Sequence, residues 1–224
     1  FIMCGIVGGV TNRDISPLLL DGLKRLEYRG YDSSGLLVLS NNHSFLRARS
    51  VGKVHNLEKN LNSRKKRIQG NIGIAHTRWA THGEPANRNA HPHISNQVVS
   101  VVHNGIIENY LELKDSQIKQ GYKFTSDTDT EVIAHAIDFA MQSNNALLHS
   151  VQKAIKTFEG AYGLGIISPH YPNTIIATRK GSPLVIGIGK YGNYIASDQL
   201  ALLSVTKKFI FLEDGDIAEL KLEK

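Results

Sequence analysis

Near its beginning the sequence reads Cys4-Gly5-Ile6-Val7-Gly8-Gly9-Val10, a cysteine followed at once by a glycine-rich run of β-type residues. The run predicts a strand over residues 6–10. Met3 directly precedes Cys4, and the small cysteine side chain is one that normal removal of an initiator methionine can expose. The pattern therefore allows Cys4 to become the first residue of a chain.

A terminal cysteine would carry a nucleophile and a base on one residue. Its α-amine titrates at ~7.7 to 8.0 and its thiol at ~8.5, so the amine can accept the thiol proton near neutral pH. Cys4 is the only cysteine, which excludes an internal disulfide. By position alone, a buried structural cysteine explains the residue slightly better than a nucleophile does.

Beyond this strand, short β-type runs alternate with helical stretches. Ser16 before Pro17 is expected to cap a helix that ends near Tyr28, and residues 126–129 offer caps for a later one. Further strands are predicted at 35–40, 72–77, 98–103, 161–168, 174–178, 184–189 and 194–197, with a hairpin over 209–220, and further helices at 108–120, 130–142 and 147–158. Short strands joined by tight turns favour antiparallel sheets packed face to face and covered by helices, an α+β fold.

The composition is that of an ordinary globular domain. The 224 residues are 41% hydrophobic and 21% charged, and no apolar run approaches the ~20 residues of a membrane span. The apolar N-terminus lacks a basic leader, so a cytoplasmic location is expected. The net charge of +6 suggests an acidic partner. However, the densest basic cluster, Arg64-Lys65-Lys66-Arg67, has no interleaved aromatic residue and is interpreted as a solvated helix end or loop.

Two other segments could carry chemistry. Asn104-Gly105 follows the strand at 98–103, so an amide side chain and a backbone N–H would stand together at a strand end as an oxyanion hole. On its own, an Asn-Gly turn between strands is the commoner explanation. The polar, aromatic and turn-rich segment from His76 to Pro85 contains an arginine that could bind a carboxylate bidentately, or form a surface ion pair.

Ten histidines also raise the question of a metal site at His76, His82, His91 and His93. No spacing matches HExxH, and a single cysteine excludes a thiolate cluster. We therefore expect no metal.

Taken together, five ordered motifs closely resemble one family, glutamine–fructose-6-phosphate aminotransferase, also called glucosamine-6-phosphate synthase. They are Cys4-Gly5-Ile6-Val7-Gly8, Glu27-Tyr28-Arg29-Gly30-Tyr31-Asp32-Ser33-Ser34-Gly35, His76 through Pro85, Val102-His103-Asn104-Gly105-Ile106 and Thr128-Asp129-Thr130-Glu131-Val132. The resemblance covers the glutaminase half, while the sugar-isomerase domains that follow it in the family are absent from this chain. It implies one glutaminase domain over 1–224 with the N-terminal-nucleophile hydrolase fold of class II glutamine amidotransferases. That fold is a four-layer αββα sandwich of two antiparallel sheets.

The resemblance also implies catalytic roles. Cys4 would attack the glutamine amide carbon and form a glutamyl thioester, the Asn104 side chain and the Gly105 N–H would hold the oxyanion, and Arg29 would support the surroundings of the nucleophile. No cofactor is needed, because the nucleophile, the base and the oxyanion donors are all protein groups.

Substrate recognition is implied in the same way. Arg78, with Thr81 and His82, would hold the α-carboxylate of glutamine, and Asp129, helped by the Gly105 carbonyl, would hold its α-ammonium. Trp79 would belong to a mobile loop that closes over the substrate. The ammonia would serve the conversion of fructose 6-phosphate to glucosamine 6-phosphate in a full-length, homo-oligomeric enzyme of hexosamine biosynthesis.

Two alternatives stand beside this interpretation. The glutaminase domain of amidophosphoribosyltransferase shares the terminal cysteine, the oxyanion pair and the fold, but Tyr28-Arg29-Gly30-Tyr31-Asp32 and the segment from Thr77 to Gly83 match the hexosamine family better. A basic nucleic-acid-binding module would leave the motif set unexplained. One departure matters: Phe1-Ile2 precede Met3, so the amine of Cys4 is tied up in a peptide bond and the chain as written is expected to be inactive.

Overall fold

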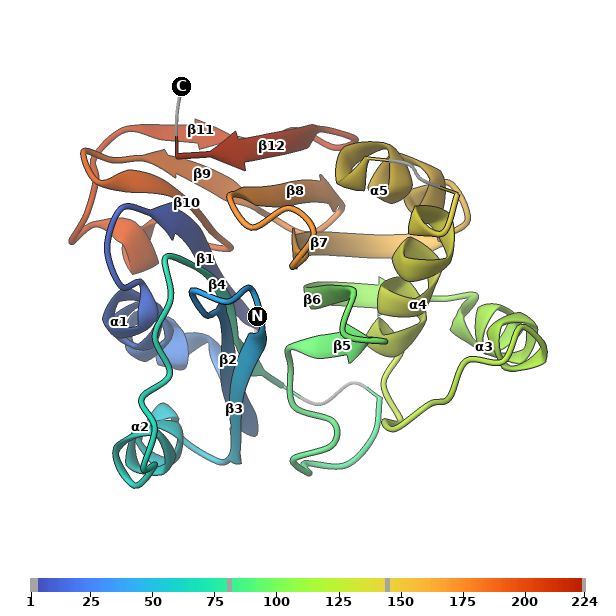
Figure 1. The fold of residues 1–224 in the computed structure, drawn as a ribbon, viewed down its shortest axis with the longest axis horizontal. Helices are drawn as coiled ribbons and strands as arrows, with labels where there is room; N and C mark the ends of the chain where they lie inside the picture. Colours follow the sequence, from blue (N-terminus) through green and yellow to red (C-terminus); the bar gives the residue numbers. More distant parts are fainter. Residues whose placement is uncertain (1–3, 80–81, 144–145, 223–224) are drawn as a thin grey trace.

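The strand that follows Cys4 lies in the middle of the larger of two antiparallel sheets (Figure 1). The computed structural model describes residues 4–79, 82–143 and 146–222. In it β1 (Gly5–Thr11) is buried throughout and pairs with β4 (Ile72–Arg78) on one side and β10 (Gly192–Ala196) on the other. The seven-stranded sheet has the order β11-β9-β10-β1-β4-β2-β3. Its other strands are β2 (Ser33–Leu39), β3 (Phe45–Val51), β9 (Val185–Ile188) and β11 (Phe209–Phe211).

The second sheet faces the first and has five strands in the order β12-β8-β7-β6-β5. These strands are β5 (His93–Ser95), β6 (Val99–Ile107), β7 (Gly160–Ile167), β8 (Thr174–Lys180) and β12 (Ile217–Lys221). Every pairing between its strands is antiparallel.

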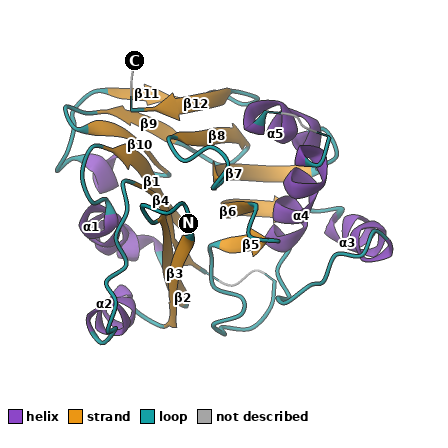
Figure 2. Ribbon diagram, viewed as in Figure 1, coloured by secondary structure: helices purple, strands orange, loops and turns teal. Residues whose placement is uncertain are grey.

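Helices cover the outer face of each sheet (Figure 2). The seven-stranded sheet is covered by α1 (Ser16–Leu26) and α2 (Val54–Asn62), with short 3-10 turns η1 (Glu27–Arg29) and η2 (Gln199–Leu202) nearby. The five-stranded sheet is covered by α4 (Thr130–Met141) and α5 (Leu147–Ile155), and α3 (Tyr110–Lys119) packs beside α4. Among the described residues, no helix has the length and apolar character needed to cross a membrane.

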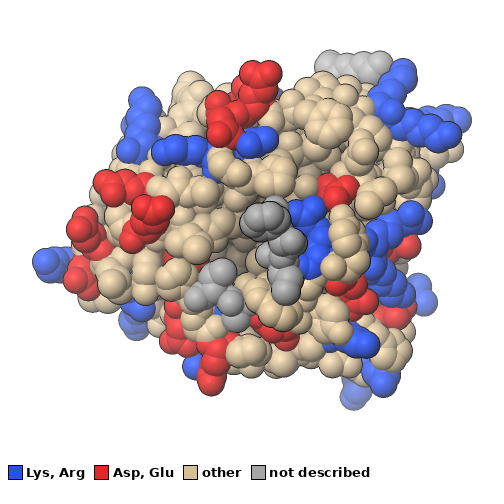
Figure 3. Space-filling model, turned by 180° about the vertical axis from the view of Figure 1, so that it is seen from behind, with Lys and Arg blue, Asp and Glu red and all other residues tan. Residues whose placement is uncertain are grey.

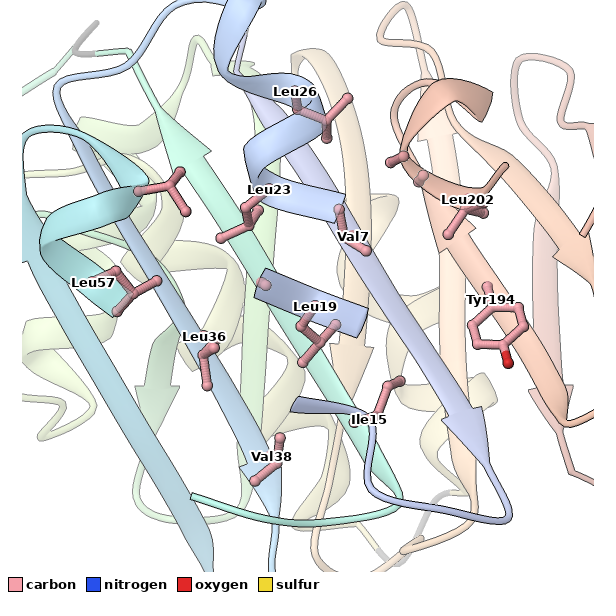
Figure 4. Packing of buried hydrophobic residues seen from close by; sticks show 14 of the residues in the cluster. Val7, Ile15, Leu19, Leu23, Leu26, Leu36, Val38, Leu57, Tyr194 and Leu202 are labelled. Carbon is pink, nitrogen blue, oxygen red and sulfur yellow. The ribbon is translucent and has the colours of Figure 1, made fainter. Parts of the chain in front are cut away.

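Three apolar clusters separate four layers. One lies between α1, α2 and the seven-stranded sheet, where Leu19, Leu23 and Leu57 meet residues of the strands beneath them (Figure 4). Another lies between the two sheets, and a third between the five-stranded sheet and α4 and α5. Within β1, Val7 belongs to the first cluster and Ile6 to the second, because successive side chains of a strand point to opposite faces. The four-layer αββα architecture is thus confirmed.

The predicted hairpin over 209–220 is wrong. β11 pairs with β9 in one sheet, whereas β12 pairs with β8 in the other. Between them Leu212 is buried in the cluster that separates the sheets, and its N–H donates to the Leu184 carbonyl at 3.2 Å. Because Leu212 is buried between the sheets, the chain passes from one sheet to the other at this residue. The segment therefore connects the two layers instead of forming a hairpin.

The predicted cap of the first helix is also wrong. Ser16 is the first residue of α1 rather than its N-cap. The carboxylate of Asp14 accepts hydrogen bonds from the Ser16 N–H at 3.1 Å and from its hydroxyl at 2.9 Å. The Asp14 carboxylate therefore accepts a backbone N–H at the start of the helix, a role that the sequence predicted for the Ser16 hydroxyl.

Three elements escape the sequence analysis: β3, α2 and β5. The polar run over α2 has only two fully buried residues, Val54 and Leu57, and its helical character comes from packing on the sheet. The basic cluster from Arg64 to Arg67 follows α2 and is exposed, as predicted. On the face drawn in Figure 3, lysine and arginine side chains are interspersed with acidic ones rather than gathered in one patch.

Candidate active site

Cys4 stands immediately before β1, with its thiol partly buried beside the end of β4. The Trp79 N–H donates a hydrogen bond to Cys4 Sγ at 3.1 Å. Burial raises the pKa of the Cys4 thiol, and the negative charge of Asp32 adds to this, while the Trp79 N–H and Arg78 oppose it. The thiol is therefore protonated at neutral pH and needs a base before it can act as a nucleophile.

Asn104 reaches Cys4 from the opposite sheet. Its Nδ2 group donates to the Cys4 carbonyl oxygen at 3.0 Å. The expectation that Asn104-Gly105 ends a strand or forms a turn is wrong, because β6 continues to Ile107 and Asn104 pairs with Gly163. The Asn104 amide is therefore carried by the interior of a strand, and the pairing of β6 with β7, which continues before and after Asn104, fixes its backbone.

Gly105 has a φ of +127°, and a Cβ atom at this position would lie 2.0 Å from the Ala161 carbonyl oxygen. Only glycine satisfies both conditions. Gly105 and Cys4 line the same cavity.

Arg78 lies at the end of β4 and is 3% exposed. Its guanidinium donates to the carbonyls of the loop that follows: to His82, to Gly83 at 2.8 Å and to Glu84 at 3.3 Å. Asp32 Oδ1 lies 3.6 Å from Arg78 Nη1. The arginine thus joins the surroundings of Cys4 to the loop that carries Trp79 and His82.

His82 lines the cavity too, and its ring meets Tyr110 edge-on at a centroid distance of 4.9 Å. Trp79 is 42% exposed at the cavity. Thr81 and the three residues before Cys4 lie outside the described residues.

Asp129 precedes α4 but does not cap it with its side chain, contrary to expectation. Its Oδ2 atom instead accepts a hydrogen bond from the Ile107 N–H at 2.8 Å. Its carboxylate lines the same cavity as Cys4, Arg78 and His82. A buried cation, a buried anion and a thiol therefore share one small cavity.

Arg29 is placed differently. It donates to Asp198 Oδ2 at 3.2 Å, an atom that also accepts the Tyr28 hydroxyl at 2.7 Å. It is not among the described residues that line the Cys4 cavity. Its support of the nucleophile remains a prediction.

Four histidines, His76, His91, His93 and His103, are buried at the site, and all of them except His93 line the cavity. Burial lowers the pKa of all four, for His76 to about 3. They are therefore neutral at neutral pH. No group of three histidine, cysteine or acidic residues in the described part of the chain is arranged to hold a metal ion.

Asn89 is a site feature that the sequence analysis missed. It is 0% exposed, and its Nδ2 donates to the Glu84 carbonyl at 3.0 Å and to Asp127 Oδ2 at 3.1 Å. Its Oδ1 accepts from the Asp127 N–H at 2.9 Å. One buried amide thus connects the loop held by Arg78 to the segment that carries Asp129. An asparagine in a polar, turn-rich run gives no sequence signal of such a connection.

Comparison with known proteins identifies a matching family and several relatives of this chain. A family model described as a glutamine amidotransferase domain matches residues 76–204. The chain is 57% identical over 217 residues to glutamine–fructose-6-phosphate aminotransferase [isomerizing] of Photorhabdus laumondii and 58% identical over 218 residues to the enzyme of that name from Acinetobacter baylyi. Each alignment covers 97% of this chain but 35% of the relative, so the chain spans about a third of the length of these proteins.

Solved structures confirm the fold. Glutamine phosphoribosylpyrophosphate amidotransferase from B. subtilis superposes with a TM-score of 0.82 over 97% of this chain and 47% of its own, at 23% identity. A glutamine aminotransferase class-II domain protein from Silicibacter pomeroyi gives 0.66 over 98% of this chain and 96% of its own, at 13% identity. The predicted N-terminal-nucleophile hydrolase sandwich is thus shared with amidotransferases of distant sequence.

Proposed function

Because this chain belongs to the glutamine amidotransferase domain family, we propose that it hydrolyses the side-chain amide of glutamine to glutamate and ammonia, with Cys4 as the nucleophile. The observation that carries this is the contact of Asn104 Nδ2 with the Cys4 carbonyl at 3.0 Å, which places an amide donor beside the thiol. Arg78 and Asp129 on the same cavity supply the charges that match the α-carboxylate and α-ammonium of the substrate.

The proposed reaction begins when the α-amine of a terminal Cys4 accepts the thiol proton and Sγ attacks the amide carbon of glutamine. Asn104 Nδ2 and the Gly105 N–H stabilise the negative oxygen of the tetrahedral intermediate. The carbon–nitrogen bond then breaks, the amine returns its proton to the leaving nitrogen, and ammonia departs. Water, deprotonated by the same amine, hydrolyses the thioester and releases glutamate with the free thiol.

Recognition of free glutamine is assigned to Arg78, Thr81, His82, Trp79 and Asp129. Arg78 already donates to three loop carbonyls, so its contact with a carboxylate requires that loop to adjust as the substrate enters. We propose that the loop closes over bound glutamine and that Trp79 moves with it.

The acceptor of the ammonia is proposed from the relatives of this chain. The similarity to glutamine–fructose-6-phosphate aminotransferases supports the proposal that the ammonia serves fructose 6-phosphate in a longer, homo-oligomeric protein. The phosphoribosylpyrophosphate amidotransferases, at 23% and 24% identity, share the fold only. A cytoplasmic location is proposed because the chemistry needs a reduced thiol.

The test is glutamate formation by a preparation that begins at Cys4, verified by intact mass. Cys4→Ala should abolish turnover, and Cys4→Ser should leave only a small fraction of it. Ser33→Ala is the control for the loss of a polar atom close to the site. Ser33 is buried in β2, pairs with Arg78 at the end of β4, and is not among the described residues that line the cavity. Hydrolysis by the alanine variant at the parent rate would show that Cys4 is not the nucleophile.

A further inference from the structure

We propose that His76 is a positioning residue that holds the side-chain amide of Asn104 with its NH2 group toward Cys4. This rests on the proposed function, in which that NH2 group stabilises the oxyanion. His76 lies in β4 of the seven-stranded sheet and Asn104 in β6 of the five-stranded sheet. The contact between them therefore crosses from one sheet to the other directly beneath the nucleophile.

The hydrogen bonds fix which ring nitrogen of His76 carries the proton. Its Nε2 atom lies 2.9 Å from the His103 carbonyl oxygen and 2.9 Å from Asn104 Oδ1. The His103 carbonyl can only accept, so Nε2 must carry the hydrogen.

The orientation of the Asn104 amide follows from both of its ends. If the amide were turned over, its NH2 group would face the Nε2–H of His76, and its oxygen would face the Cys4 carbonyl oxygen at 3.0 Å without a hydrogen between them. Both contacts would then be repulsive. The observed orientation is the one that satisfies His76, Asn104 and Cys4 together.

The ring itself is held in place. It stacks on His91 at a centroid distance of 4.1 Å and an interplanar angle of 18°. His91 is held in turn by the His103 N–H, which donates to its Nδ1 at 3.4 Å, and by Thr130 Oγ1, 3.2 Å from its Nε2. His76 Nδ1 is buried and has no hydrogen-bond partner among the residues that the structure describes, so the contacts at Nε2 are the polar contacts that orient the ring.

His76 keeps this role through the neutral pH range. Burial lowers its pKa to about 3, with the neighbouring His103 and Arg78 adding to the effect and the contacts with Asn104 and the His103 carbonyl opposing it. A neutral ring with a fixed Nε2–H is a constant donor. The hydrogen-bond contacts of His76 are with Asn104, the proposed oxyanion donor, and with the His103 carbonyl, and neither group is proposed to hold the charged end of glutamine. The effect of His76 therefore falls on the chemical step and not on substrate binding.

The experiment compares four variants of the chain beginning at Cys4: His76→Phe, His76→Gln, His76→Asn and, as the matched control, the exposed His149→Phe. The amide nitrogen of glutamine reaches the position of His Nε2, whereas that of asparagine reaches only the position of Nδ1. Loss of one oxyanion donor lowers kcat by roughly 10²- to 10³-fold. We expect His76→Phe and His76→Asn to approach this loss with the glutamine KM unchanged, His76→Gln to recover most of the activity, and His149→Phe to match the parent.

Several results would overturn the proposal. Parent-like kcat in His76→Phe, equal losses in the glutamine and asparagine variants, or a rise in KM at constant kcat would each exclude a positioning role. If His76→Phe does not fold, the comparison of kcat between His76→Gln and His76→Asn still tests the proposal. An inactive parent that begins at Cys4 would instead refute the proposed function itself, which separates the two failures.

Discussion

The side-chain amide of Asn104 and the backbone carbonyl of Cys4 are joined by a hydrogen bond of 3.0 Å that connects two sheets. Cys4 precedes a central strand of one sheet, and Asn104 lies inside a strand of the other. The distance between thiol and amide is therefore set by how the sheets pack, and the apolar cluster between them determines the geometry of the site.

Gly105→Ala should destabilise the protein and abolish turnover. A side chain at a φ of +127° is strained by roughly 1–3 kcal/mol, and the new Cβ would also meet the Ala161 carbonyl oxygen at 2.0 Å. Gly121→Ala is the matched control, because Gly121 has a φ of +93° with nothing within 4 Å of the added atom. Urea unfolding should show a larger loss for Gly105→Ala than for Gly121→Ala. Equal losses would mean that the strand shifts to accept the methyl group.

Arg78→Lys and Asp129→Asn should each raise the glutamine KM by at least about tenfold. A lysine cannot reproduce the several donors that Arg78 presents to the loop and to a carboxylate, and an asparagine cannot neutralise an ammonium group. Arg88→Lys is the control: Arg88 pairs with Glu84 and Asp127 nearby, but its side chain is 49% exposed. Steady-state kinetics provide the measurement. Unchanged KM values in both site variants would place the charged end of glutamine elsewhere.

A chain that begins at Cys4 should hydrolyse glutamine at least a hundredfold faster than one that begins at Phe1. An amine in a peptide bond cannot accept the thiol proton, and a general base is worth ~10² to 10⁴ in rate. Burial raises the pKa of the Cys4 thiol, so the thiol needs a base to lose its proton near neutral pH. Intact mass identifies the two forms, and thermal unfolding verifies that both fold. Equal turnover would show that another group acts as the base.

Folding stability should decrease as the pH falls from 7.5 to 5. The pKa values of His76, His91, His93, His103 and His135 are lowered in the folded state, chiefly by burial. In the unfolded chain these side chains titrate near ~6.5, so below that pH the unfolded state binds more protons. Each such histidine removes up to about 1.4 kcal/mol per pH unit. Urea unfolding at several pH values provides the test. Carboxylates with lowered pKa, such as Asp127 and Asp198, contribute only at lower pH. A flat profile would mean that the histidines accept protons without unfolding.

Much of the fold could be predicted from local sequence. The glycine-rich β-type run of β1 and the helical stretch of α4 are clear in the sequence, and their predicted positions are confirmed within one or two residues. The crossing between β11 and β12 could not be predicted, because a turn-like Glu213-Asp214-Gly215-Asp216 is equally compatible with a hairpin and with a change of sheet. Burial of Leu212 decides between them, and burial is a tertiary property.

Sequence motifs, rather than geometry, predict the residues of the candidate site. Cys4, Asn104, Arg78 and Asp129 line or adjoin one cavity although the sequence separates them widely. The sequence did not reveal that Asn104 lies inside a strand, or that His76 and Asn89 hold the polar groups of the site in place. Such roles depend on which atoms meet across the fold, and no spacing in the chain encodes them.

The central position of β1 has a consequence for synthesis on the ribosome. β1 ends at Thr11, whereas one of its partners, β10, begins only at Gly192, so β1 emerges long before β10 does. Until β10 emerges, the edge of β1 that it covers stays open, and pairing over so long a stretch of chain is slow and prone to aggregation. The strand that follows Cys4 is therefore made long before its pairing is complete, so a nascent chain has no finished site until β10 has left the ribosome.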